Sequence, residues 1–97
     1  RFRLQVLAIG ARCRLGELLL ARGEPERAAV HAADALRIEP LHERAARLLA
    51  HASIAQSHRA GAQRALESVI RRLREQGLRP EPDTERLAGT LGLDLPN

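Results

Sequence analysis

The chain has 97 residues, a net charge of +4 and no lysine, so arginine supplies all 16 basic residues, and this length suits one small domain. Phe2 is the one aromatic residue, so helices must pack through aliphatic and alanine contacts. The one cysteine, Cys13, excludes an internal disulfide and favours a reducing cytoplasm. The sequence has no apolar run of about 18 residues and no signal-peptide pattern, which excludes a membrane-spanning or visibly exported chain.

Apolar residues recur at helical spacing at the start of the chain and predict a helix over about residues 2–22. The positions that carry this pattern are Leu4, Leu7, Ala8, Ala11, Leu15, Leu18 and Leu19. Gly23 follows as a left-handed cap, and Pro25 suits the first turn of a second helix over about residues 25–38. Because the link is only about two residues long, the two helices must run antiparallel.

Proline and glycine also bound the later helices. Pro40 ends the second helix, because the residue before a proline is biased out of the helical region. A third helix is expected over about residues 41–56 and a fourth over about 60–76, with Gly77 as its cap. The inward positions are Ala45, Leu48, Leu49 and Ala52 in the third helix, and Ala62, Ala65, Leu66, Val69, Ile70 and Leu73 in the fourth.

A fifth, short helix is expected over about residues 82–91, because Pro82 suits a first helical turn. Its Leu87 and Leu91 are spaced to cover the end of the fourth helix, as the last repeat of a solenoid requires. Residues 92–97 are expected to form a frayed tail, in which Leu93 and Leu95 are the residues able to tuck back.

A weaker copy of the first helical hairpin recurs 34 residues further on. Leu15, Gly16, Gly23, Ala28 and Ala35 correspond in this register to Leu49, Ala50, Ser57, Ala62 and Val69. Self-similarity at this period is typical of stacked helical hairpins, which build solenoids with a concave binding face. The sequence therefore predicts an all-α fold of two hairpins, over about residues 2–40 and 41–77, with a C-terminal capping helix.

The residues of the first hairpin in this register, from Leu15 to Ala35, together with Pro40 resemble a tetratricopeptide repeat. The C-terminal half adds the segments Pro40-Leu41-His42-Glu43, Arg64-Ala65-Leu66-Glu67 and Gly77-Leu78, followed by Pro80-Glu81-Pro82-Asp83-Thr84 and Leu87. This order resembles the bacterial transcriptional activator domain of regulators of the antibiotic regulatory protein type, over about residues 1–91. The resemblance implies a tetratricopeptide-like module that follows a winged-helix DNA-binding domain. No part of the chain matches that winged helix, so no DNA-reading residue is assigned.

The distribution of charge argues against a dedicated nucleic-acid site. Acidic and basic residues alternate along the helices, and the pairs Asp34/Arg37, Glu43/Arg47 and Glu67/Arg71 have the spacing of ion pairs on one helix face. The densest basic run, residues 71–74, has no aromatic residue for base stacking. We therefore expect weak, salt-sensitive DNA affinity without sequence preference.

The third helix carries the candidate binding surface. Arg44, Arg47 and His51 share one helix face, which is not the face of Leu48 and Leu49. In tetratricopeptide repeats this helix lines the concave groove, and the counterparts on the first helix are Glu17 and Leu20. One hypothesis is a basic stripe for an acidic or carboxylate-bearing partner, with arginine forks as anchors. The alternative is ordinary solvent surface, in which Arg47 pairs with Glu43.

The sequence gives little sign of catalysis, metal binding or a cofactor. His31 and Asp34 lie one turn apart and His51 and His58 two turns apart, which falls short of a zinc site. Cys13 has no base near it in sequence, although a thiol–histidine pair across the fold stays open. The chain also lacks an initiating methionine and opens in a helical pattern, so we expect a fragment of a longer protein.

The favoured interpretation is a non-catalytic, cytoplasmic regulatory module of a bacterial transcription regulator. Its expected partners are its own DNA-binding domain, a second protomer or the transcription machinery, with DNA reached only through a domain outside this chain. A free-standing tetratricopeptide scaffold remains an alternative. An RNA-reading helical repeat is less favoured, because matching groove positions differ between the repeats: Glu17 corresponds to His51, and Cys13 to Arg47.

Overall fold

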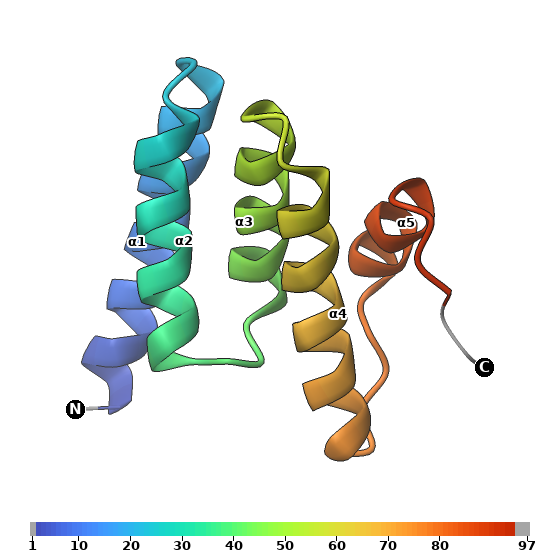
Figure 1. The fold of residues 1–97 in the computed structure, drawn as a ribbon. Helices are drawn as coiled ribbons and strands as arrows, with labels where there is room; N and C mark the ends of the chain where they lie inside the picture. The colour runs from blue at the N-terminus through green and yellow to red at the C-terminus, as the bar shows by residue number, and fades with distance from the viewer. Residues whose placement is uncertain (1, 95–97) are drawn as a thin grey trace.

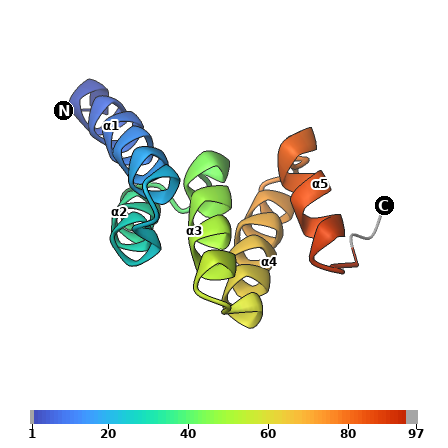
Figure 2. The same ribbon diagram turned by 90° about the horizontal axis from the view of Figure 1, so that it is seen from above.

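Five α-helices make up the described part of the chain in the computed structural model, which covers the backbone of residues 2–94 and the side chains of residues 8–94. The helices are α1 (Phe2–Ala21), α2 (Pro25–Ile38), α3 (Glu43–Ala55), α4 (Arg59–Glu75) and α5 (Pro82–Thr90). The first four form two antiparallel hairpins side by side, and α5 follows beyond α4 (Figure 1). Seen from above, α1, α3 and α5 lie along one side and α2 and α4 along the other (Figure 2). The all-α, two-hairpin fold with a terminal helix is confirmed.

Left-handed residues end four of the helices: Gly92 follows α5 with φ of +75°, and the other three follow α1, α3 and α4. Gly23 and Gly77 have φ of +78° and +71°, as expected for glycine caps. Ser57 ends α3 in the same conformation, with φ of +61°, and it occupies the repeat position of Gly23. In all four turns the next residue's N–H bonds back to a helix carbonyl, at 2.8–2.9 Å. The second repeat therefore keeps the turn geometry although it lacks the glycine.

The start of α3 differs from the sequence prediction. The helix begins at Glu43 rather than near residue 41, because Pro40 and Leu41 form a turn and His42 is the N-cap. The Glu39 carboxylate accepts the Leu41 N–H at 3.0 Å, and Nδ1 of His42 accepts the Ala45 N–H at 3.2 Å. A histidine at the N-cap thus satisfies one of the free N–H groups of the first turn.

The interior is lined by small residues in the first hairpin and by larger aliphatic residues in the second. Residues with no exposed surface at the α1–α2–α3 junction are Cys13, Ala28, Ala32, Ala35 and Ala45. The core of the second hairpin contains Leu66, Val69, Ile70 and Leu73 from α4, with Ala88 and Leu91 from the α5 region. Leu87 and Leu93 pack against this core, which agrees with the predicted cap, whereas Leu95 lies outside the described residues.

Gly16 lies where three helices meet. A Cβ atom at this position would be 2.5 Å from Cδ2 of Leu48 in α3 and 3.4 Å from the carbonyl oxygen of Ala28 in α2. The lack of a side chain at Gly16 therefore lets α1 approach both α2 and the next hairpin closely. The outward face of α1, by contrast, exposes Leu15 and Leu18, although both belong to the apolar pattern that predicted the helix.

Candidate interaction groove

All five residues predicted to form the groove line one concave hollow of about 440 Å³. α1 contributes Glu17, Leu20 and Ala21, α3 contributes Arg44, Arg47, Leu48 and His51, and α5 contributes Asp83. The placement follows from the fold, because α1, α3 and α5 share one side of the molecule (Figure 2). Asp83 was not predicted, since only the path of the chain after α4 brings the first turn of α5 to this surface.

An ion pair between α1 and α3 spans the groove. The guanidinium group of Arg44 donates from Nε and Nη2 to the two carboxylate oxygens of Glu17, at 2.8 and 2.7 Å. This bidentate geometry is the strong form of an arginine–carboxylate contact. The hydrogen bond from Arg44 lowers the pKa of Glu17 and raises the pKa of Arg44 itself. The arginine fork is therefore already occupied by a carboxylate of the same chain.

Arg47 ties α3 to the start of α5. Its Nη1 atom donates to Oε1 of Glu81 and to Oγ1 of the buried Thr84, both at 2.8 Å. Glu43, which the alternative hypothesis paired with Arg47, instead accepts the backbone N–H of Glu81 at 2.7 Å. That part of the alternative is wrong, because the extended segment before α5 supplies better-placed partners to both side chains.

Carboxylates outnumber guanidinium groups around these arginines. A second hollow of about 440 Å³ shares Arg44 and Arg47 with the groove and is otherwise lined by Glu39, Leu41, His42, Glu43 and Glu81. Together the two hollows hold five acidic residues and two arginines. The surface is thus a set of paired charges with carboxylates in excess, rather than the unpaired basic stripe that the sequence suggested.

Cys13 and His42 form the thiol–histidine contact that the sequence left open. Sγ of Cys13 lies 4.0 Å from Nδ1 of His42, and the same nitrogen accepts the Ala45 N–H. Burial raises the pKa of the Cys13 thiol and lowers the pKa of the His42 imidazole. Both groups are therefore neutral near pH 7, and the thiol is fully buried. This environment is that of an inert core cysteine, not of an activated nucleophile.

The described residues contain no group of three or more His, Cys, Asp or Glu side chains placed to hold a metal ion. Asp34, which lies one turn from His31, is engaged by arginines instead: it accepts from Arg12 at 3.1 Å and also pairs with Arg37. The Asp34/Arg37 pair predicted from helical spacing is therefore confirmed.

In the same described part, no helix is both long enough and apolar enough to cross a membrane.

Comparison with known proteins supplies a family for this arrangement. A family model described as the bacterial transcriptional activator domain matches residues 1–91, which include both hairpins, α5 and every residue of the groove. Neither the comparison with curated proteins nor that with solved structures gave a match. The all-helical architecture is compatible with the tetratricopeptide-like fold that the sequence resemblance implies. On the extent of the family match, the chain belongs to the bacterial transcriptional activator domain family.

Proposed function

We propose that this chain is the non-catalytic regulatory module of a bacterial transcription regulator and that its groove binds a protein segment. The family supports a role in transcriptional activation. The observation that carries the binding role is the convergence of Glu17, Leu20, Arg44, Arg47 and His51 on one concave surface. The winged helix that reads DNA belongs to another part of the regulator. The partner at the groove is that domain, a second protomer or the transcription machinery, all in the bacterial cytoplasm.

The charges of the groove define the kind of segment that it accepts. An acidic segment would have to displace Glu17 from Arg44 and would meet Asp83 at the opposite wall. A segment with a cationic or amide group leaves both arginine contacts intact and has only to exchange with Arg86, which pairs with Asp83 on the exposed surface of α5. Leu20 is half-buried and offers an apolar contact on the α1 side of the same hollow. The groove therefore suits a segment with an apolar residue next to a basic or amide side chain.

The contacts around the groove also favour a binding role over a catalytic one. Cys13 and His42 are held in their neutral forms, and the nitrogen that faces the thiol already accepts a backbone N–H. Arg44 and Arg47 are held in fixed positions by carboxylates from α1 and from the segment before α5. Such ion pairs position helices relative to one another, which suits a module that holds its partners in a set geometry.

A reporter assay with the native regulator and its promoter tests the proposal. The double variant Ala21→Glu/His51→Glu changes two exposed groove residues, and we expect at least a tenfold loss of promoter activation. Val30→Glu is the matched control, because Val30 is 58% exposed and lies on α2, outside the groove. Thermal unfolding should show that all variants remain folded, since surface changes alter stability by only about 0.5 kcal/mol.

Three results separate the possible failures. Loss of activation in the groove variant alone supports the proposal. Unchanged activation in that variant overturns the binding role of the groove. If the unsubstituted protein activates no promoter but still captures a protein partner, the chain is a scaffold and the transcriptional role is wrong.

A further inference from the structure

The whole net charge of the chain resides in one segment. Residues 59–79, which comprise α4 and the turn that follows, contain six arginines and two glutamates, a net charge of +4. The rest of the chain balances ten arginines against ten acidic residues. The net charge of +4 for the full sequence is therefore a local property of residues 59–79.

The arginines of α4 also differ in their contacts from most of the other described arginines, although Arg14 and Arg22 likewise form no ion pair. In the first hairpin and the groove, Arg12, Arg27, Arg37, Arg44 and Arg47 each pair with a carboxylate. Among the described residues of the α4 segment, no ion pair is formed by Arg59, Arg64, Arg71, Arg72 or Arg79. The Glu67/Arg71 pair predicted from helical spacing is not formed, so that prediction is wrong.

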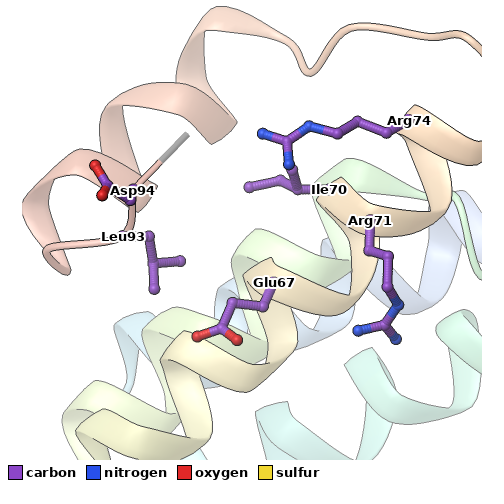
Figure 3. A pocket seen from close by; sticks show the side chains of 6 residues that line it. All are labelled: Glu67, Ile70, Arg71, Arg74, Leu93 and Asp94. Carbon is purple, nitrogen blue, oxygen red and sulfur yellow. The ribbon is translucent and has the colours of Figure 1, made fainter. Parts of the chain in front are cut away.

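The geometry of α4 spreads these charges over one surface. Its core residues Leu66, Val69 and Leu73 face the hairpin, which turns Arg64 and Arg71 outward on the opposite side. Arg64 and Arg71 are two helical turns apart, a rise of about 10 Å. Figure 3 shows the side chains of Arg71 and Arg74 leaving α4 in different directions around a shallow hollow of about 360 Å³, which Glu67 and Asp94 also line.

Spread, exposed guanidinium groups match a continuous anion better than a single carboxylate. α4 is 17 residues long, which corresponds to about 25 Å. Duplex DNA presents one negative charge for about every 1.7 Å of its axis, so a duplex lying along the outer face of α4 has phosphates spaced closely enough to meet both Arg64 and Arg71. With no aromatic residue in this segment, stacking on single-stranded bases has no support. Phosphate contacts of this kind fix position without reading sequence.

From these observations we infer that the exposed face of α4 and the turn that follows it, with Arg64, Arg71, Arg72 and Arg79, is a docking surface for the sugar–phosphate backbone of duplex DNA. The inference goes beyond the proposed role of the groove and does not depend on which protein the groove holds. The module would then bind DNA without sequence preference, next to the sequence that the DNA-binding domain of the regulator recognises.

The test measures binding of the 97-residue chain to a fluorescent duplex of about 20 base pairs by anisotropy, over a series of salt concentrations. We expect a dissociation constant of about 1–100 µM at low salt, in the range of non-specific binding. In the variant Arg64→Gln/Arg71→Gln/Arg72→Gln, affinity should fall at least tenfold. The slope of log K against log salt should decrease by about 2.7, which is about 0.9 for each lost phosphate contact.

A charge-matched variant provides the control. Arg12→Gln/Arg27→Gln/Arg37→Gln also removes three positive charges, but these arginines are already paired with Asp34 or Glu24. We expect this variant to lose less than about threefold in affinity, since paired arginines contribute few phosphate contacts.

Three results would overturn the inference. The first is an equal loss in the two triple variants, which would reduce the effect to net charge. The second is undetectable binding by the unsubstituted chain at low salt. The third is competition by poly-glutamate as effective as that by duplex DNA, which would make the surface a site for acidic proteins. Because the assay contains only DNA, a failure here leaves the reporter test of the groove unaffected.

Discussion

The two hairpins follow one 34-residue pattern but are stabilised by different means. In the first, Gly16, Ala28 and Ala32 bring the helix backbones close together. In the second, Ala50 and Ala62 stand at the repeat positions of Gly16 and Ala28, and large side chains of α4 such as Leu66 and Leu73 complete the core. The hairpin geometry is preserved because the turns are equivalent, as Gly23 and Ser57 show. Equivalent turns thus allow the interior to change from small to large residues without a change of fold.

The concave groove and the outer face of α4 also differ in how their arginines are paired. The arginines that face the groove are paired, and Arg44 and Arg47 hold α3 to α1 and to the start of α5. The arginines of α4 are turned to solvent, and those we assign to the docking surface make no ion pair among the described residues. One repeat pattern therefore carries a concave surface with carboxylates in excess and a basic outer surface, which suits two different partners.

The largest expected effect comes from removing a large side chain in the second hairpin. Leu66 is fully buried, and Leu66→Ala leaves a cavity that neighbouring helices fill only in part. We expect a loss of about 2–5 kcal/mol in the free energy of unfolding, measured by urea denaturation. Leu18→Ala, at a residue that is 46% exposed on α1, should cost less than about 1 kcal/mol. Equal costs would show that the second hairpin does not depend on its large core residues.

The stability of the first hairpin should be sensitive to an added methyl group at Gly16, where the helices pack closely. Gly16→Ala forces Leu48 to move, and overpacking of about 1–3 kcal/mol outweighs the gain of about 1 kcal/mol in helix propensity. We expect a net loss of about 1 kcal/mol, or roughly 4–8 °C in Tm.

Gly10→Ala on the same helix is the matched control for the Gly16 variant. An added Cβ at Gly10 meets nothing within 4 Å, so the substitution should stabilise the chain by about 0.5–1 kcal/mol. If both alanine variants stabilise the chain equally, close backbone approach at Gly16 is not what holds the first hairpin together.

The sequence predicted the helices well because each boundary has a local chemical signal. Gly23, Pro25, Gly77 and Pro82 act within a few residues, and the structure has helix ends at each of them. The start of α3 was missed by two residues, because the cap is a histidine, which is not among the preferred N-cap residues.

The residues that line the groove on α1 and α3 were predicted from the sequence, but the contacts of Arg47 were not. Helical periodicity combined with the 34-residue register placed Glu17 and Arg44 on facing surfaces, and they form the predicted groove wall. The pairing of Arg47 with Glu81 depends on an extended segment whose path no periodicity encodes. The Glu67/Arg71 pair was predicted from spacing alone, yet such a pair is worth only about 0.3–0.5 kcal/mol, too little to fix two long side chains.

The smallest expected effect concerns the junction between the hairpins and depends on pH. Burial lowers the pKa of His42 below its ordinary value of 6.5, so the unfolded chain takes up a proton at a higher pH than the folded one. Stability that is complete above about pH 6.5 must therefore decline as the pH falls through the folded-state pKa. Thermal unfolding between pH 7.5 and about 5 should show a decline of about 1 kcal/mol or less from this residue.

His42→Asn separates the cap from the titration. Asparagine is a good N-cap acceptor but does not ionise in this range, so the variant should keep most of its stability at pH 7.5 and lose less of it on acidification. The pKa of Glu17 is lowered by Arg44, so its contribution is complete above about pH 4.5 and is lost only in more acidic solution. A decline that starts near pH 6.5 thus reports His42, and identical profiles in the two proteins would show that this neutral histidine is not what joins the hairpins.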